Sequence, residues 1–165
     1  MNNKRTPDLR IEGARLIFRN FAGKETKYTG PGHRTTAVII DDLELAERLR
    51  QDGWNVKDFR PNPDTGEVDA AFLSVKINYD NRPPKIVLIT GTRDRNKQTV
   101  LDEESVSMLD WMDILSVDVV ISPYHYSVSG REGISAYLKT MYVLAEEDAF
   151  ASKWESEDED EVPFE

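Results

Sequence analysis

The stretch LRIEGARLIFRNF, residues 9–21, predicts a long β-strand that contains a bulge. Its apolar residues stand at positions 9, 11, 14, 16, 18 and 21, and Gly13 interrupts the alternation. A bulge bends a strand and increases its twist, so this pattern is typical of a strand that curves around a small β-barrel. Residues 1–8 are polar, contain Pro7 and are expected to form a flexible arm.

Six further strands are expected after this one. Residues 35–40 are β-branched and apolar, which favours a buried strand. The remaining strands are predicted over residues 54–59, 71–79, 85–90, 117–128 and 134–144.

The order of these strands predicts two hairpins. Residues 71–79 and 85–90 are expected to pair antiparallel, and a polar, basic loop is expected at 91–98. The last two strands are expected to form a hairpin across residues 129–133.

Two short helices are also predicted. Asp41 and Asp42 supply an N-cap for the first, which ends at Gly53. Asp102 caps the second, over residues 103–115. Trp54 and Trp111 are assigned to packing, Trp111 because its helix needs an anchor.

The elements form no strand–helix–strand series, which excludes a purely parallel sheet. We therefore predict a mainly β protein: a small antiparallel β-barrel, closed or partly open, with inserted strands and two short helices. This domain is expected to span residues 9–147, and residues 148–165 are expected to form a disordered acidic tail.

The net charge of −10 is distributed very unevenly along the 165 residues. Residues 146–165 hold ten acidic residues and one basic residue, so 21 of the 31 acidic and 20 of the 21 basic residues remain in the rest of the chain. The body is therefore close to neutral. Two of its segments, residues 1–40 and 76–97, are basic, and the charge of the tail does not argue against binding of nucleic acid.

The chain contains no cysteine, which excludes disulfides and thiolate metal sites. No apolar run is long enough to span a membrane and no secretory signal is recognised, so a cytoplasmic location is expected.

No pattern of an enzyme emerges. The two histidines, His33 and His125, have no nucleophile or carboxylate at a spacing that would indicate a catalytic triad. No glycine-rich phosphate loop is present. We therefore predict a protein without catalytic residues, cofactor or metal.

Basic and aromatic residues recur together on the predicted strands and loops. Binding of single-stranded nucleic acid needs cations along the phosphate path and flat rings on which bases stack. The sequence therefore predicts a DNA-binding surface made of Arg15, Arg19, Phe21, Lys24, Lys27, Tyr28, Lys76, Arg82, Lys85, Arg93, Arg95, Tyr124, Tyr126, Arg131, Tyr137 and Lys139.

Simple alternation also predicts which way some of these side chains point. On the first strand it turns Phe21 outward with Arg15 and Arg19, and it turns Phe18 inward. On the last strand it groups on one face Tyr137, Lys139 and Met141.

Four stretches resemble bacteriophage single-stranded DNA-binding proteins: RIEGARLIFRNFAGKE from residue 10, ELAERLRQDGWNVK from residue 44, NRPPKIVLIT from residue 81 and SGREGISAYLKTMYV from residue 129. The resemblance implies an oligonucleotide-binding (OB) fold, no enzymatic activity, and a role in coating single strands during DNA replication and recombination.

The end of the chain adds a second likeness to this family. Such proteins commonly end in an acidic run with a hydrophobic tip that docks onto basic pockets of replication proteins. The residues that match here are Glu157, Asp158, Glu159, Asp160, Glu161, Pro163 and Phe164, and Glu165 follows them. A tail of this charge is also expected to fold back and compete with DNA for the basic surface.

Two other functions stay open at this stage. The acidic tail of an interaction protein could mimic DNA and occupy the nucleic-acid site of a partner, or the fold could assemble an unrecognised carboxylate cluster. The sequence also leaves open whether the chain forms a homo-oligomer.

Overall fold

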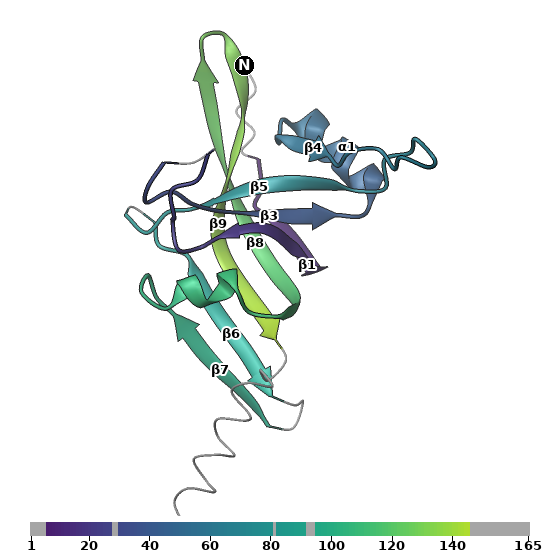
Figure 1. Cartoon of the computed structure of the whole chain (residues 1–165). Coiled ribbons are helices and arrows are strands. Elements are labelled where there is room, and N and C mark those ends of the chain that lie inside the picture. Colours follow the sequence, from purple (N-terminus) through teal and green to yellow (C-terminus); the bar gives the residue numbers. More distant parts are fainter. Residues whose placement is uncertain (1–5, 28–29, 81, 92–94, 146–165) are drawn as a thin grey trace, which may run out of the picture.

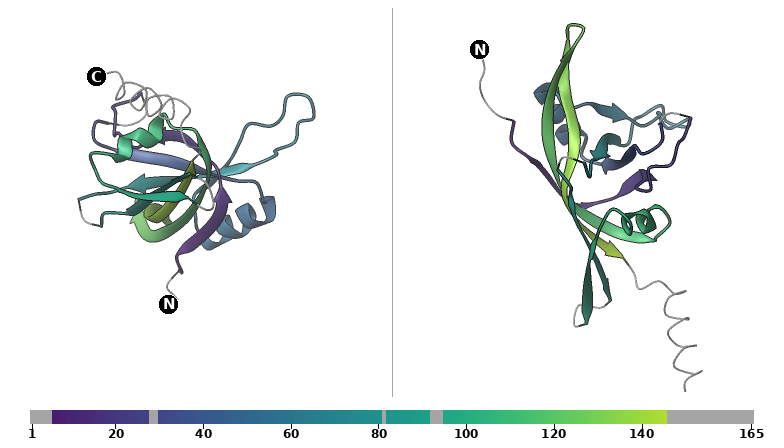
Figure 2. Two further views of the ribbon diagram at one scale, coloured as in Figure 1. Left: turned by 90° about the horizontal axis from the view of Figure 1, so that it is seen from below. Right: turned by 90° about the vertical axis from the view of Figure 1, so that its left-hand side faces the viewer.

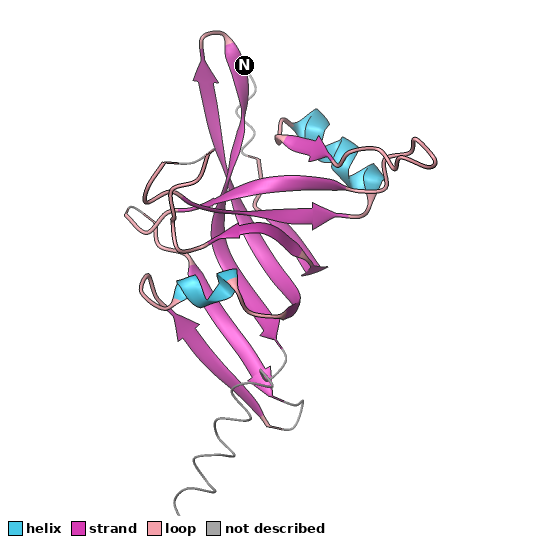
Figure 3. Cartoon of the chain, in the orientation of Figure 1, coloured by secondary structure: helices cyan, strands magenta, loops and turns pink. Residues whose placement is uncertain are grey.

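The structure is a computed structural model that describes residues 6–27, 30–80, 82–91 and 95–145. As predicted, this part of the chain is mainly β, with one α-helix and one 3₁₀ turn (Figures 1 and 3). The elements are β1 (Leu9–Ala14), β2 (Leu16–Asn20), β3 (Arg34–Ile40), α1 (Leu43–Asp52), β4 (Val56–Asp58), β5 (Ala71–Ile77), β6 (Lys85–Gly91), β7 (Asn96–Leu101), η1 (Val106–Asp110), β8 (Ile114–Val128) and β9 (Arg131–Ala145).

The strands form one mixed sheet, ordered β1-β8-β9-β5-β3-β2, with β4 beside β5 and β6 between β9 and β7. The two ends of this path, β1 and β2, are joined through Arg15, whose carbonyl accepts a 2.9 Å hydrogen bond from the Ile39 N–H. Hydrogen bonds among the described strands leave the path open and not closed into a barrel, which is consistent with an OB-like fold.

The predicted bulge in the first strand is confirmed. Gly13 has a φ of 63°, which glycine adopts readily, and its N–H donates a 2.8 Å hydrogen bond to the Asp118 carboxylate on β8. The pairing of β1 with β8 shifts between Ile11 and Ala14. The bend at this point lets one stretch of chain pair first with β8 and then with β3.

A second irregularity, which the sequence did not predict, reverses the expected facing of two phenylalanines. Phe18 has a φ of 52°, and the register of β2 against β3 shifts between Ile17 and Asn20. Phe18 is therefore 67% exposed, whereas Phe21 is fully buried. The prediction that turned Phe21 outward and Phe18 inward was wrong, because it carried simple alternation through a bulge.

The predicted pairing of the strands near residues 71–79 and 85–90 was also wrong. Both strands exist, but β5 and β6 each pair in parallel with β9, one after the other along the same edge. The segment between them contains Pro83 and Pro84 and carries the chain forward along β9 instead of reversing it. Prolines lack the N–H that a hairpin ladder requires.

Part of the loop predicted at 91–98 is a strand. Residues 96–98 belong to β7, which pairs antiparallel with β6. This hairpin and the tip of the β8–β9 hairpin extend in opposite directions (Figure 2). Because most of β7 is exposed, its residues carry no apolar alternation that the sequence could have shown.

The first helix is confirmed and the second is much shorter than predicted. Asp42 caps α1 by accepting from the Glu44 and Leu45 N–H groups, and Gly53 ends it in the left-handed conformation. Asp102 caps only the turn at residues 103–105, where its carboxylate accepts from the Glu104 and Ser105 N–H groups. The helical segment that follows is the five-residue turn η1, whose N-cap is Ser105, so the prediction that Asp102 caps a helix over 103–115 was wrong. No described helix is long and apolar enough to cross a membrane.

The two tryptophans differ. Trp54 is 4% exposed, so its assignment to packing is confirmed. Trp111 is 69% exposed, so its assignment was wrong. It follows η1 directly, and the buried residues of this turn, Val106 and Leu109, provide the anchor instead.

The predicted β8–β9 hairpin is confirmed, with longer strands and a tighter turn at Ser129 and Gly130. On β9, Lys139 is an extra residue, because Val120 pairs with Thr140 while Ile121 pairs with Leu138. This bulge changes the facing after residue 139. Met141 is therefore buried, and the prediction that it shares a face with Tyr137 and Lys139 was wrong.

We expect truncation of the buried Phe21 and of the exposed Trp111 to have very different effects on stability. Phe21→Ala should lower the free energy of unfolding by about 3–5 kcal/mol, because it leaves a cavity in the core. Trp111→Ala should change it by no more than about 0.5 kcal/mol, because the ring is exposed. Urea denaturation of both variants checks this, and similar losses would contradict the assignment.

The cap at Asp102 should make stability depend on pH. Hydrogen bonds from the Ser105 N–H and hydroxyl, the largest causes, and from the Glu104 N–H lower the pKa of the Asp102 carboxyl. A lowered folded pKa gives stability that is present above the unfolded pKa and is lost as pH falls through the folded pKa. The difference in melting temperature between the native chain and Asp102→Ala should therefore shrink below about pH 4.

The exposed Asp64 offers a control for the loss of one negative charge. If the same pH-dependent difference occurred with Asp64→Ala, the effect would come from net charge and not from the cap.

Candidate nucleic-acid interface

The outer face of β5 carries the residues from which the candidate interface is built. Ala71, Leu73, Val75 and Ile77 are buried, so the alternate residues of the strand point outward. Those residues are Phe72, Ser74 and Lys76.

Lys76 lies beside two tyrosines of the long hairpin. It pairs in register with Tyr137 of β9, and its Nζ lies 5.7 Å from the centre of the Tyr137 ring. The Tyr137 and Tyr124 rings meet edge to face, with centroids 6.0 Å apart and planes at 73°. Tyr124 is 61% exposed. The strand register thus holds two rings and one cation together at the surface.

A groove of about 880 Å³ borders these rings. Besides Tyr124 and Tyr137 it is lined by Arg82, Lys139 and Asp8. Asp8 accepts a 2.8 Å ion-pair contact from the Lys139 ammonium. Its charge therefore offsets part of the positive charge in the groove.

The other end of the same face holds three phenylalanines. Phe72 packs against Phe18, with ring centroids 5.6 Å apart, and against Phe59, at 5.1 Å. This cluster was not predicted from the sequence, because simple alternation turns Phe18 inward. A glycine at position 18 would have signalled the bulge, but the residue there is phenylalanine.

Four predicted residues thus line the groove: Arg82, Tyr124, Tyr137 and Lys139. A fifth, Lys76, lies against the Tyr137 ring. Two more lie further out on the hairpin. Tyr126 is paired with Gly133, and Arg131 is exposed at the turn.

Other predicted residues lie apart from this group or have structural partners. Arg15 is ion-paired with Asp41 at 3.0 Å. Arg19 donates hydrogen bonds to the carbonyls of Leu109 and Met112, so it ties β2 to η1. Exposed cations that the structure places outside the groove lining are Lys24, Lys27, Lys85 and Arg95.

Phe21 cannot stack on a base in this structure, because its ring is fully buried. Tyr28, Arg93 and all the predicted tail residues lie outside the described part of the chain.

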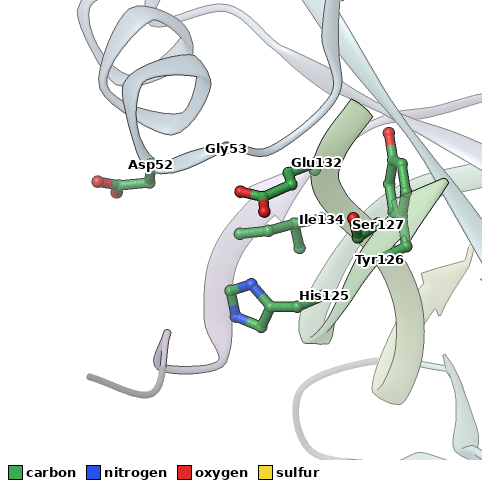
Figure 4. A pocket seen from close by; sticks show the side chains of 8 residues that line it. Asp52, Gly53, His125, Tyr126, Ser127, Glu132 and Ile134 are labelled. Atoms are coloured by element: carbon green, nitrogen blue, oxygen red, sulfur yellow. The ribbon is translucent and has the colours of Figure 1, made fainter. Parts of the chain in front are cut away.

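A second, smaller pocket lies between the end of α1 and the β8–β9 hairpin (Figure 4). It has a volume of about 490 Å³, and Asp52, Glu132 and His125 border it. Its two carboxylates disfavour a phosphate. Among the described residues, no His, Asp and Glu side chains are grouped so that they could hold a metal ion.

Tyr79, which follows β5, belongs to the core and not to the interface. Its hydroxyl is buried without a hydrogen-bond partner among the described residues, and Arg34 lies 5.2 Å from the centre of its ring. Burial raises the pKa of the Tyr79 phenol, and the Arg34 charge partly opposes this. The phenol is therefore neutral at physiological pH.

An exposed sheet face that combines rings with cations is the surface on which single-stranded nucleic acids stack. The fold and the interface thus define a nucleic-acid-binding class of protein. The chain belongs to the family described as putative phage ssDNA-binding domain, whose model matches residues 1–162. This confirms the resemblance found in the sequence and the prediction of a binding protein instead of an enzyme.

Solved structures with a similar fold include the single-stranded DNA-binding protein from bacteriophage Enc34. Its C-terminal truncation aligns with a TM-score of 0.54 and 12% identity, over 90% of this chain and 98% of that one. Its complex with ssDNA aligns with a TM-score of 0.53 and 11% identity, over 89% and 98%. At this identity the likeness concerns the fold alone. Among curated proteins, none matches the chain.

Proposed function

We propose that this protein binds single-stranded DNA, without sequence preference, on the face of β5, β8 and β9 that carries Lys76, Tyr124 and Tyr137. The observation that carries the proposal is the contact of these three side chains: a cation 5.7 Å from one ring, and a second ring in edge contact with it. Membership of the phage ssDNA-binding family supports it, as does the neighbour of similar fold in complex with ssDNA.

The chemistry of this face favours stacking over reading of bases. Every base has a flat face, and stacking on an aromatic side chain is worth about 1–3 kcal/mol per base whatever the base is. Arg82 and Lys139 at the groove attract phosphates, which adds a term that weakens with salt. Two stacked bases and a few phosphate contacts therefore suffice for binding without sequence preference.

The biological role that fits is the coating of single strands during phage DNA replication and recombination, in the cytoplasm of the host. We further propose that the acidic tail, residues 148–165, competes with DNA for the basic face and docks onto replication or recombination proteins. Its ten-to-one ratio of acidic to basic residues over 146–165 supports the first role, and the Pro163–Phe164 tip supports the second.

Truncation of the stacking rings should weaken DNA binding. We expect Tyr137→Ala to reduce affinity for a dT oligonucleotide by about 5–150-fold, the equivalent of about 1–3 kcal/mol. The salt dependence should change little. Lys76→Ala should instead lower the slope of log K against log salt by about 0.7, because it removes one phosphate contact. Fluorescence anisotropy at several salt concentrations measures both quantities.

Tyr142 provides the matched control. It is an exposed tyrosine on the same strand, β9. It pairs with Asp118 of β8, whose charge disfavours a phosphate. Tyr142→Ala should bind as the native chain does. Full affinity in a Tyr124→Ala, Tyr137→Ala double variant would rule out this face as the DNA site.

Removal of the tail should strengthen DNA binding at low salt. Deletion of residues 148–165 should raise affinity about tenfold near 0.01 M salt, where the Debye length is about 30 Å, and much less at 0.1 M, where it is about 10 Å. A variant that neutralises Glu157–Glu161 and keeps Phe164 should behave like the deletion. Unchanged affinity for DNA in both variants would contradict competition between the tail and DNA. If deletion of the tail alone abolished the function of the protein, the result would favour the DNA-mimic function.

A further inference from the structure

We propose that Phe18, braced by Phe59 and Phe72, forms a second base-stacking subsite on the same sheet face. A bound strand would then run along β5, from the Tyr124–Tyr137 pair to the Phe18 ring. The inference rests on the proposed function and adds to it a binding site and a direction for the DNA.

Phe18 is exposed in a way that packing does not explain. Its side chain is 67% exposed, although it lies in the middle of β2. Its φ of 52° is uncommon for a bulky residue, and such backbone strain of about 1–3 kcal/mol is concentrated at functional sites. The strained bulge is what turns the ring outward. A buried ring at this position would have needed no such conformation.

Phe72 contacts the Phe18 ring directly, and Phe59 supports Phe72. Phe72 meets Phe18 edge to face at 73°, and the Phe59 ring packs against Phe72 at an interplanar angle of 48°. Phe59 and Phe72 are half-buried, so the cluster is anchored on the sheet. A ring that is held in this way loses little conformational freedom when a base stacks on it.

A cation accompanies these rings, as it does at the tyrosines. Lys57 of β4 is exposed and lies opposite Phe72 in the register of β4 with β5. Side chains opposite each other in an antiparallel pair share a face and lie close together. The face therefore repeats one arrangement twice: Lys57 beside Phe72, and Lys76 beside Tyr137.

The two stacking positions lie within reach of one strand of DNA. Phe72 and Lys76 are four residues apart on β5, which is about 13 Å at about 3.3 Å per residue. Between them on the outer face stands only Ser74 from this strand, and it is exposed. This small side chain leaves room for the DNA backbone to pass from one set of rings to the other.

The length of the oligonucleotide distinguishes this subsite from the first one. A dT dinucleotide is too short to span the about 13 Å between the two ends, since stacked nucleotides advance about 3.4 Å each, and should occupy the tyrosine end alone. An oligonucleotide of about 16 nucleotides should cover both ends. Phe18→Gly is the sharpest variant, because glycine adopts the positive φ of this position without strain. We expect it to weaken binding of the long oligonucleotide at least about fivefold and to change binding of the short one less than about twofold.

The outcomes separate the two proposals. If Phe18→Gly binds the long oligonucleotide as the native chain does, or loses the same factor for both lengths, the second subsite is wrong. The proposed function still stands in that case, provided that Tyr137→Ala weakens both lengths. If the native chain binds neither length at low salt, the proposed function itself fails.

Cross-linking tests the subsite in the native chain, without reliance on a variant. Irradiation of its complex with a dT oligonucleotide that carries 5-iodouracil should yield an adduct on Phe18, identified by mass spectrometry of the peptides. Phe21, three residues away and fully buried, is the internal control and should yield none. Adducts confined to Tyr124 and Tyr137 would overturn the proposal.

Discussion

The central constraint of this fold is that β9 pairs with three strands at once. One edge of it pairs with β8 over nearly its whole length, and the other edge pairs in parallel first with β5 and then with β6. The bulge at Lys139 lies between the last pair with β5, at Tyr137, and the first pair with β6, at Thr140. An extra residue there lets Leu138 and Met141 both face the core although three positions separate them.

The candidate interface follows from this arrangement. Parallel pairing places Lys76 beside Tyr137, and the hairpin turn returns Tyr124 to the same place. The rings are therefore positioned by backbone hydrogen bonds and not by loops. The proposed stacking on any base relies on such an arrangement, since its energy comes from flat surfaces at fixed positions and from charge, with no need to reach base edges.

Comparison of sequence and structure shows where pattern reasoning holds. It succeeded where a local signal had a physical cause: the bulge at Gly13, the helix cap at Asp42 and the β8–β9 hairpin. It failed at Phe18 and Lys139, where a bulge is formed without a glycine to announce it. Trp111 was misassigned because the helix expected to need it is a single turn.

The sequence by itself determined the mainly β class, the recurrence of basic residues with aromatic ones, and the separation of an acidic tail from a near-neutral body. These depend on composition and on contacts between near neighbours. Only the tertiary structure decided which strands lie side by side. It thereby decided which four of the predicted residues line the groove and why Phe18 is outside while Phe21 is inside. Strand partners are chosen by burial summed over the whole sheet, and a shift of one residue in register moves every following side chain to the other face.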